Sequence, residues 1–469
     1  MNIAVIGAGN RARKYLGCLP EGVYVRCLVE PDPLRLRQTA AHYGVPSDGC
    51  FSSADDFFAA SSLRSNHVMA DSAAEASGCK TALRCAPGPS RTSGSPIPLT
   101  WPRVATGFAP TASSAASASD TPASGSGIDA VIIAAPDRLH VPLALQCVER
   151  GWPVLLEKPA ASSESAYRSL IAASERKGVP VALCLEMRFH PFFRRIKELT
   201  ATLGQLREID HTEHIGPDRM AHTFVRGLWS RRADSGPIFL SKCCHDADFI
   251  FWITGAQLDG PVRSRGERAK FRAAGAPEGA AHRCVDCPLS ANCPYSAVSL
   301  YLERGEWIDG FDVPEGDTLE QVIRRELASG RYGRCVYHCD NNVYDTQEIS
   351  ATLTTPSLPG VSSSSLPGVS GQSIALTMRL DGTSLEEGRT TIIKGDAGTL
   401  TADAGRIHID YADGRVLDED FSALRSAPLH AGADEALVRD FFAALSSGRT
   451  PAATLSSSFA AHRLCFLAG

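Results

Sequence analysis

A glycine-rich turn separates a strand-like segment from a helix-like segment near residue 7. Residues 3–6 (IAVI) have the composition of a buried strand, and residues 10–19 that of a helix. Gly7 permits a tight turn, and Gly9 lets a pyrophosphate approach the backbone where the helix begins. Ala12 is the third small residue, where helix and strand pack closely. The pattern predicts a dinucleotide-binding unit, the alternative being an empty fold of the same type.

An acidic residue ends the second predicted strand, which covers residues 23–29. A carboxylate at this position, Glu30, can hydrogen-bond both ribose hydroxyls and repels a 2′-phosphate, so we expect NAD rather than NADP. Arg35 lies nearby, on the following helix. The residues of this segment that we expect to bind the cofactor are Gly7, Gly9, Asn10, Arg11, Ala12 and Glu30.

Strands and helices alternate along residues 1–187. We expect further strands at residues 129–135, 153–156 and 179–185, and helices at residues 33–43, 140–150 and 162–177. This alternation is typical of an α/β fold with a doubly wound parallel sheet, a Rossmann domain. Residues 61–127 lack the pattern, and their Ala- and Ser-rich part cannot bury enough apolar area, so we expect a disordered insertion.

The second half, residues 188–469, has a different pattern. We expect helices at residues 191–202 and 434–446, and strands near residues 206–214, 348–354, 373–380 and 389–394. This predicts an α+β domain with a mostly antiparallel open sheet. The segment SLPGVS occurs twice within residues 357–373, which we interpret as a low-complexity loop.

Composition excludes several classes of protein. A net charge of −5 argues against a nucleic-acid partner, which wants a basic field. No run of about 18 apolar residues predicts a membrane span, and no secretory leader is recognisable. Fifteen cysteines scattered over 469 residues are expected to be mostly free thiols in a reducing compartment, the cytoplasm.

Several motifs at the ends of predicted strands resemble those of the Gfo/Idh/MocA family of oxidoreductases. They are Ala134-Ala135-Pro136-Asp137 with His140, Glu157-Lys158-Pro159, Arg188-Phe189-His190-Pro191 and Cys244-His245-Asp246-Ala247-Asp248. The resemblance covers nearly the whole chain apart from residues 61–127 and 357–373. It implies a Rossmann domain followed by an α/β domain whose open sheet makes a homo-oligomer contact. It adds Pro136, His140, Glu157 and Lys158 to the expected cofactor site.

Lys158 follows an apolar strand at the edge of the sheet where doubly wound folds bind ligands. Its ammonium can stabilise the alkoxide that develops as hydride leaves a carbinol carbon. The alternative is a surface lysine before a turn. Within the family pattern we expect a catalytic role.

His245 is the expected general base, because an imidazole with a pKa near 6.5 accepts a hydroxyl proton near neutral pH. The alternative is a buried core histidine. Many members of the family that the chain resembles carry Asp four residues earlier, where this chain has Ser241. The chain resembles a branch with K-x-C-H-D, in which Lys242 contacts substrate or orients His245.

The resemblance extends to the segment 222–229, HTFVRGLW. Its side chains could bind the hydroxyls of a polyol or a carboxylate, or instead form surface ion pairs and core contacts. The expected substrate-binding residues are Arg188, His222, Arg226, Trp229 and Asp246.

Three cysteines, Cys284, Cys287 and Cys293, form a C-x₂-C-x₅-C pattern with His282 just upstream. With His282, Cys335 or Cys339 as a fourth ligand they could hold a structural zinc ion. Free thiols that pack a loop, or redox-active thiols, are the alternatives. A second C-x₂-C is missing, and we expect no metal.

Together these features predict an NAD-dependent oxidoreductase, with NADP the less favoured cofactor, acting on the CH–OH group of a sugar, inositol or related polyol. One alternative is a regulatory sensor that keeps the dinucleotide fold. Another is a glycoside-cleaving enzyme that uses bound NAD transiently. The sequence leaves the substrate and the reaction direction open.

Overall fold

The computed structural model describes residues 1–62, 127–355 and 371–469. Two compact units make up the chain, one of residues 1–54 and 128–469 and the other of residues 55–127. The expected insertion at residues 61–127 and the loop at residues 357–373 lie mostly outside the described residues. Everything below concerns the first unit.

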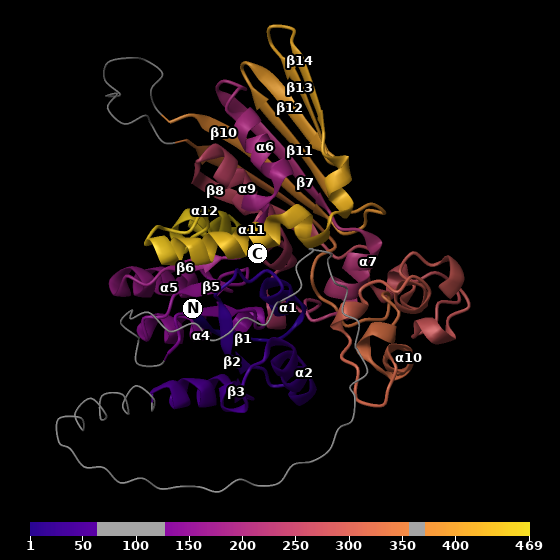
Figure 1. The fold of residues 1–469 in the computed structure, drawn as a ribbon. Coiled ribbons are helices and arrows are strands. Elements are labelled where there is room, and N and C mark those ends of the chain that lie inside the picture. The colour runs from indigo at the N-terminus through magenta and orange to yellow at the C-terminus, as the bar shows by residue number, and fades with distance from the viewer. Residues whose placement is uncertain (63–126, 356–370) are drawn as a thin grey trace, which may run out of the picture. The chain divides into compact units, whose positions relative to one another are not determined.

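A six-stranded parallel sheet has the order β3-β2-β1-β4-β5-β6 (Figure 1). The chain adds β2 and β3 on one side of β1 and then crosses to add β4, β5 and β6 on the other side. This is the Rossmann order, and it confirms the predicted fold class. Its strands are β1 (Asn2–Ile6), β2 (Tyr24–Val29), β3 (Cys50–Phe51), β4 (Ala130–Ile133), β5 (Val154–Leu156) and β6 (Val181–Leu183). Its helices are α1 (Asn10–Leu16), α2 (Pro33–Tyr43), α4 (His140–Glu149) and α5 (Glu164–Lys177).

Local sequence explains where these helices begin and end. The Asp32 carboxylate accepts the amide of Arg35 at 2.8 Å, Pro33 occupies the first turn, and α2 ends at Gly44 with φ +67°. Ser163 caps α5 in the same way, and Gly178 ends it in the left-handed region. These are the stop and start signals that short polar residues, proline and glycine provide.

A second sheet of eight strands has the order β14-β13-β12-β11-β7-β10-β9-β8. Only the β7–β10 pair is parallel, which confirms the expected mostly antiparallel sheet. The strands are β7 (Leu206–His214), β8 (Gln257–Glu267), β9 (Thr346–Thr354), β10 (Ser373–Asp381), β11 (Gly388–Gly395), β12 (Gly398–Asp403), β13 (Arg406–Tyr411) and β14 (Val416–Asp420). The helices of this half are α6 (Pro191–Thr200), α7 (Pro217–Arg219), α8 (Arg232–Ser235), α9 (Ile238–Thr254), α10 (Leu319–Ser329), α11 (Pro428–Ser447) and α12 (Leu455–Ala468).

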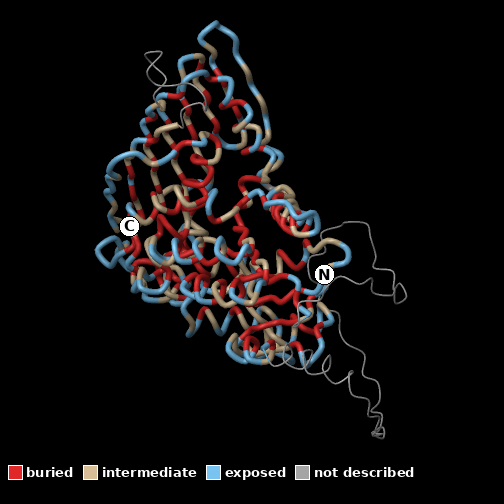
Figure 2. Tube along the Cα trace, turned by 90° about the vertical axis from the view of Figure 1, so that its left-hand side faces the viewer, coloured by how far each residue is buried: buried red, intermediate tan, exposed pale blue. Residues whose placement is uncertain are grey.

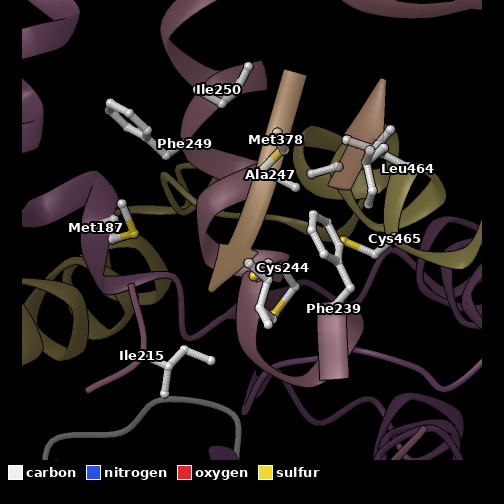
Figure 3. Close-up of a cluster of buried hydrophobic side chains, with 14 of the residues drawn as sticks. Met187, Ile215, Phe239, Cys244, Ala247, Phe249, Ile250, Met378, Leu464 and Cys465 are labelled. Carbon is white, nitrogen blue, oxygen red and sulfur yellow. The ribbon is translucent and has the colours of Figure 1, made fainter. Parts of the chain in front are cut away.

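Helix α9 carries His245 and is almost entirely buried. Figure 3 shows its side chains Cys244 and Ala247 near Met378 of β10 and Cys465 of α12, all in one hydrophobic cluster. Figure 2 shows buried segments running through both sheets. Because α9 is packed on several sides, the positions of its polar side chains are fixed by the core.

The last two helices return to the Rossmann sheet. Leu437 and Phe441 of α11 belong to the same hydrophobic cluster as Ile3 of β1 and Leu28 of β2. Next to α12, the Leu183 amide of β6 bonds to the Ala453 carbonyl at 2.9 Å. Figure 1 shows α11 and α12, in yellow, between the two sheets. The C-terminal helices therefore complete the N-terminal core.

Candidate active site

The glycine-rich turn packs against the end of β4. Gly7 has φ +94°, and a Cβ built on it would lie 2.4 Å from the Ala134 carbonyl oxygen, so only glycine fits. A Cβ built on Gly9 would meet no atom within 4 Å, so the turn is open on that side. Asn10 begins α1 and is exposed. This combination of a tight inner glycine and an open outer one fits a bound pyrophosphate.

Glu30 lies beside the turn with only 5% of its surface exposed. One carboxylate oxygen accepts the Ala8 amide at 2.8 Å, and the other accepts the Asp32 amide at 3.0 Å. Arg35 Nη1 is 3.4 Å from Glu30, but its Nη2 donates to Asp312 at 2.7 Å. Asp312 belongs to a segment of the second half that the sequence did not connect to this edge. The arginine nearest the ribose position is therefore already paired.

Glu157 contacts helix α1, which follows the glycine-rich turn. Its carboxylate accepts the Arg11 Nε at 2.8 Å, the Lys158 amide at 2.8 Å and the Tyr15 hydroxyl. Burial would raise the pKa of Glu157, but Arg11, Lys158 and the Tyr15 hydrogen bond hold it below its ordinary value. Arg11 also donates to Asp434 of α11 at 3.1 Å. Hydrogen bonds of Arg11 and Glu157 thus connect helix α1 to the end of β5 and to helix α11.

His140 connects two loops at the carboxyl edge of the sheet. Its Nδ1 lies 2.7 Å from the Pro159 carbonyl oxygen, and its Nε2 lies 2.9 Å from that of Ala135. The side chain is completely buried, and Pro136 caps the short helical turn that precedes it. Both ring nitrogens are used within the protein, so His140 holds the walls of the expected cofactor site.

Lys158 lies half-buried at the carboxyl end of β5, and its ammonium donates to the Ser241 carbonyl oxygen of α9 at 2.8 Å. Burial would lower its pKa, but carboxylates nearby, among them Glu157 and Asp137, raise it above the ordinary value. The side chain is a fixed ammonium ion. It is held at the edge where parallel strands present ligands.

His245 faces this edge from α9, and 7% of its surface is exposed. Burial lowers the pKa of His245 well below its ordinary value, and the Lys158 ammonium lowers it further. This corrects the expectation of a pKa near 6.5. The buried imidazole is neutral around pH 7, and its Nδ1 has no hydrogen-bond partner in the described structure.

Glu186 is a site residue that the sequence analysis missed. It follows β6, and its Oε1 lies 3.4 Å from Nε2 of His245. Its Oε2 is buried and has no hydrogen-bond partner in the described part of the chain. The signal that singled out Lys158, a polar residue after a buried strand, applies equally to Glu186.

Lys242 pairs with Glu213 of β7 within a buried ionic network. Arg389 of β11 lies 3.0 Å from Glu213 and donates to Asp246 at 2.6 Å. Nε2 of His211 is 3.2 Å from Oδ1 of Asp246, the same oxygen that accepts from Arg389. Burial would raise the pKa of Asp246, but Arg389, the His211 hydrogen bond and Lys242 hold it well below its ordinary value. Glu213 and Arg389 have no local sequence signal, because the β7–β11 register aligns them.

Three expected substrate-binding residues make polar contacts within the second half, although Nη1 of Arg226 is buried without a hydrogen-bond partner in the described structure. All five N–H donors of Arg188 bond to Asp248, Ser457 and the Ala452 carbonyl. His222 stacks on Tyr332 and bonds to Tyr301. Arg226 is fully buried and donates to the carbonyls of residues 295 and 334. Arg188 has no N–H left for a substrate, and the polar contacts of the other two lie within the second half.

Trp229 does reach the Rossmann edge. Its indole N–H donates to Asp137, after β4, at 3.0 Å. Asp137 is buried, and burial raises its pKa, with Lys158 and His140 opposing the rise. Trp229 therefore connects the second half to the loop beside Lys158.

The cysteine-rich segment contains free thiols. Cys284 accepts the Arg226 Nη2 at 3.4 Å, and the other cysteines of the segment are also unbridged. Among residues 1–62, 127–355 and 371–469, no three His, Cys, Asp or Glu side chains are grouped so as to hold a metal ion. Nor does any described helix have the length and apolarity to cross a membrane.

Comparison with known proteins gives matches over part of the chain. The family model described as "Oxidoreductase family, NAD-binding Rossmann fold" (GFO_IDH_MocA) matches residues 104–184. Myo-inositol dehydrogenase Hyg17 of Streptomyces leeuwenhoekii is 29% identical over 135 residues, 28% of this chain and 39% of the relative. Inositol 2-dehydrogenase of Rubrobacter xylanophilus is 30% identical over 139 residues, 28% of this chain and 36% of the relative. The chain thus spans less than half the length of these relatives.

Similarity of fold extends further than similarity of sequence. The crystal structure of an oxidoreductase from Agrobacterium radiobacter in complex with NAD⁺, L-tartaric acid and magnesium covers 99% of this chain and 94% of its own, with a TM-score of 0.58 at 13% identity. At that identity the likeness concerns the fold alone. The Rossmann part of this chain is therefore similar to the Gfo/Idh/MocA oxidoreductases in its family match, and the whole chain shares the fold of the solved oxidoreductase.

Proposed function

We propose that the chain is an NAD-dependent oxidoreductase that acts on a hydroxyl-bearing carbon of a sugar, inositol or related polyol. The observation that carries the proposal is a charged Lys158 and a neutral His245 at the carboxyl edge of a Rossmann sheet. The names of the two inositol dehydrogenases matched above support the substrate class. Bound NAD would accept or supply the hydride.

The chain's own residues supply the proton chemistry. The neutral imidazole of His245 can accept the hydroxyl proton of a substrate as its O–H bond breaks. The electron pair of that bond stays on the oxygen, where the Lys158 ammonium stabilises the developing negative charge. His245 is buried and Lys158 is half-buried, so their interactions with a bound substrate are screened less than in water.

NAD is the expected cofactor because negative charge surrounds the ribose position. Glu30 lies there, and Asp312 neutralises Arg35, the nearby cation that could otherwise pair with a 2′-phosphate. Calorimetry should therefore give tighter binding of NAD than of NADP. Equal or tighter binding of NADP would contradict this part of the proposal.

The test of the proposed activity is a panel of inositols, aldoses and acyclic polyols, each incubated with NAD while NADH absorbance is followed. We expect turnover on at least one compound, and its loss in Lys158→Ala. Tight NADH binding without turnover on any compound would favour the sensor alternative. Release of an aglycone without net NADH would favour the glycoside-cleaving alternative.

A homo-oligomer contact belongs to the same proposal. The outward face of the second sheet carries paired charges, with Lys394 bonded to Glu208 and Arg379 to Asp210. Light scattering of the purified protein tests for a dimer or larger assembly. The free thiols of the described cysteines support a reducing compartment, the cytoplasm.

A further inference from the structure

His245 has one ionisable neighbour at its Nε2 that is not bonded elsewhere. Glu186 Oε1 lies 3.4 Å from that atom, and the two side chains are only 13% and 8% exposed. Nδ1 of His245 and Oε2 of Glu186 are both buried, without hydrogen-bond partners in the described structure. Each of these two neighbouring side chains thus buries one polar atom without a partner, which is costly to maintain and marks a site that awaits a ligand.

One turn before His245 on α9 stands Ser241, which offers the imidazole no carboxylate. Ser241 directs its hydroxyl to the Ile238 carbonyl at 3.3 Å, and its own carbonyl accepts Lys158. Asp246, next to His245 on α9, is engaged on the sheet side by Arg389 and His211. The imidazole therefore has no carboxylate partner from its own helix.

We propose that Glu186 is the positioning residue of His245, a carboxylate supplied from the end of β6 rather than from α9. This inference rests on the proposed function and adds a residue to its site. Glu186 and Lys158 follow neighbouring strands of the sheet, so one rigid edge holds both groups against α9.

The consequence is a choice of tautomer. A neutral imidazole has a single N–H, and a carboxylate facing Nε2 keeps the proton there. Nδ1 then has a free lone pair and is the atom that receives the substrate's hydroxyl proton. When that proton arrives, the O–H bond has broken, an N–H bond has formed at Nδ1, and Glu186 stabilises the resulting imidazolium.

The charges around His245 determine how this arrangement responds to pH. They are Glu157 and Lys158 at the end of β5, Glu186 after β6, Asp246 on α9 and Arg389 on β11. The Lys158 ammonium opposes protonation of the ring, Asp246 and Glu157 favour it, and the Glu186 carboxylate lies 3.4 Å from Nε2. Removing the Glu186 charge should therefore weaken the base and move the acid limb of the pH–rate profile to lower pH.

The first experiment observes the tautomer without any turnover. ¹⁵N-labelled histidine in the full chain gives separate signals for protonated and unprotonated ring nitrogens, and His245 is assigned by the signal lost in His245→Ala. We expect the Nε2–H form in the wild type and a shift towards Nδ1–H in Glu186→Gln. An unchanged tautomer in Glu186→Gln would overturn the proposal, whatever the enzyme's substrate.

The second experiment measures kinetics on a polyol that the wild type oxidises. Glu186→Gln should lower kcat about 10²-fold or more with little change in KM, as expected when a general base is lost. Glu186→Asp, which keeps the charge, should recover part of the rate and the acid limb. In a His245→Ala background, Glu186→Gln should cost nothing further, because the two residues act as a unit. A full additional loss in that background would overturn the proposal.

Stability separates positioning from a structural role. Glu186→Gln should melt at the same temperature as the wild type or higher, because the buried Oε2 of Glu186 has no hydrogen-bond partner in the described structure, which costs folding energy. Glu21→Gln, an exposed carboxylate of the same domain, is the matched control and should change neither stability nor rate. A marked loss of stability in Glu186→Gln with an unchanged pH profile would contradict the inference. Absence of turnover in the wild type would contradict the proposed function, and the tautomer measurement would still decide the role of Glu186.

Discussion

Glu186 and Arg188 stand in the same short helical turn after β6, and their partners His245 and Asp248 both lie on α9. The two pairs differ in how their hydrogen bonds are satisfied. Every N–H of Arg188 has a partner, whereas Glu186 Oε2 and His245 Nδ1 have none in the described structure. Both pairs are largely buried, so the saturation of their hydrogen bonds is what distinguishes a pair that holds the fold from a pair that can act on a ligand.

The largest expected effects on activity come from substitutions of His245, a member of the pair with unsatisfied polar atoms, and of Lys158 beside it. His245→Ala should lower kcat roughly 10²–10⁴-fold, and Lys158→Ala roughly 10²–10³-fold. The free energy of unfolding should change little by comparison. The double variant should lose less than the product of the two, because both act on one hydroxyl. Steady-state kinetics and denaturant unfolding measure both quantities, with the exposed Lys177→Ala as control.

Near-normal turnover in His245→Ala would mean that the base lies elsewhere. Asp246 and Lys242 would then be the groups to test, although both are engaged in the Arg389 and Glu213 network.

The saturated pair should show the opposite behaviour. Arg188→Ala leaves Asp248 buried without its partner, which should cost about 3–5 kcal/mol of folding stability. Arg188→Met combined with Asp248→Leu should recover much of that loss, because no charge is then left buried. Guanidinium unfolding measures the free energy of unfolding of each variant. If the folded Arg188→Ala variant binds NAD normally but has a strongly raised KM for the polyol, Arg188 contacts substrate and the comparison between the two pairs fails.

Two buried histidines extend the comparison to pH. Both ring nitrogens of His462 have hydrogen-bond partners. Burial lowers the pKa of His462 to about 4 in the folded protein, whereas the pKa of an unfolded histidine is near 6.5. Between these values the unfolded chain binds more protons, so His462 should contribute up to about 3 kcal/mol of stability that is present above pH 6.5 and lost as pH falls towards 4. Unfolding curves of His462→Gln should lose part of this slope.

His245 should instead affect the pH dependence of activity. Its lowered pKa places the acid limb of kcat/KM below pH 6.5, since the ring stays neutral until the pH falls through its folded pKa. A limb at or above pH 6.5 would show that another group controls the rate.

The smallest expected effect concerns cofactor choice. Asp312→Asn would free Arg35 to pair with a 2′-phosphate, so NADP affinity should rise by roughly tenfold, the ~1.4 kcal/mol scale of one charge-assisted hydrogen bond. NAD affinity should stay the same. Asp317→Asn, an exposed carboxylate paired with Arg325, is the control. Unchanged NADP affinity would leave Glu30 alone as the determinant.

Residues with a local signature could be predicted from sequence. Gly7, Gly9 and Glu30 lie at the ends of apolar strands, and the structure has the predicted turn there. Lys158 follows a strand in the same way, and its place at the sheet edge follows from that alone. Glu186 obeys the same rule, and it could have been found by examining every residue that follows a buried strand.

Residues whose role depends on a distant partner could not be predicted in this way. Nothing near Arg188 in sequence indicates that Asp248 and Ser457 will use up its donors. The contact between Arg389 and Glu213 depends on the β7–β11 register, and Asp312 reaches the ribose edge from another part of the fold. Such contacts are created by tertiary packing, which motif spacing does not encode.

The return of α11 to the Rossmann sheet has a consequence for how the chain is made. Leu437, Val438, Phe441 and Phe442 form part of the hydrophobic core that covers β1 and β2. A ribosome delivers β1 to β6 long before it delivers residues 428–447. During translation the nucleotide-binding sheet therefore has an uncovered apolar face, the kind of surface that chaperones bind and that aggregates form on. Its folding can be completed only after the last helices have emerged.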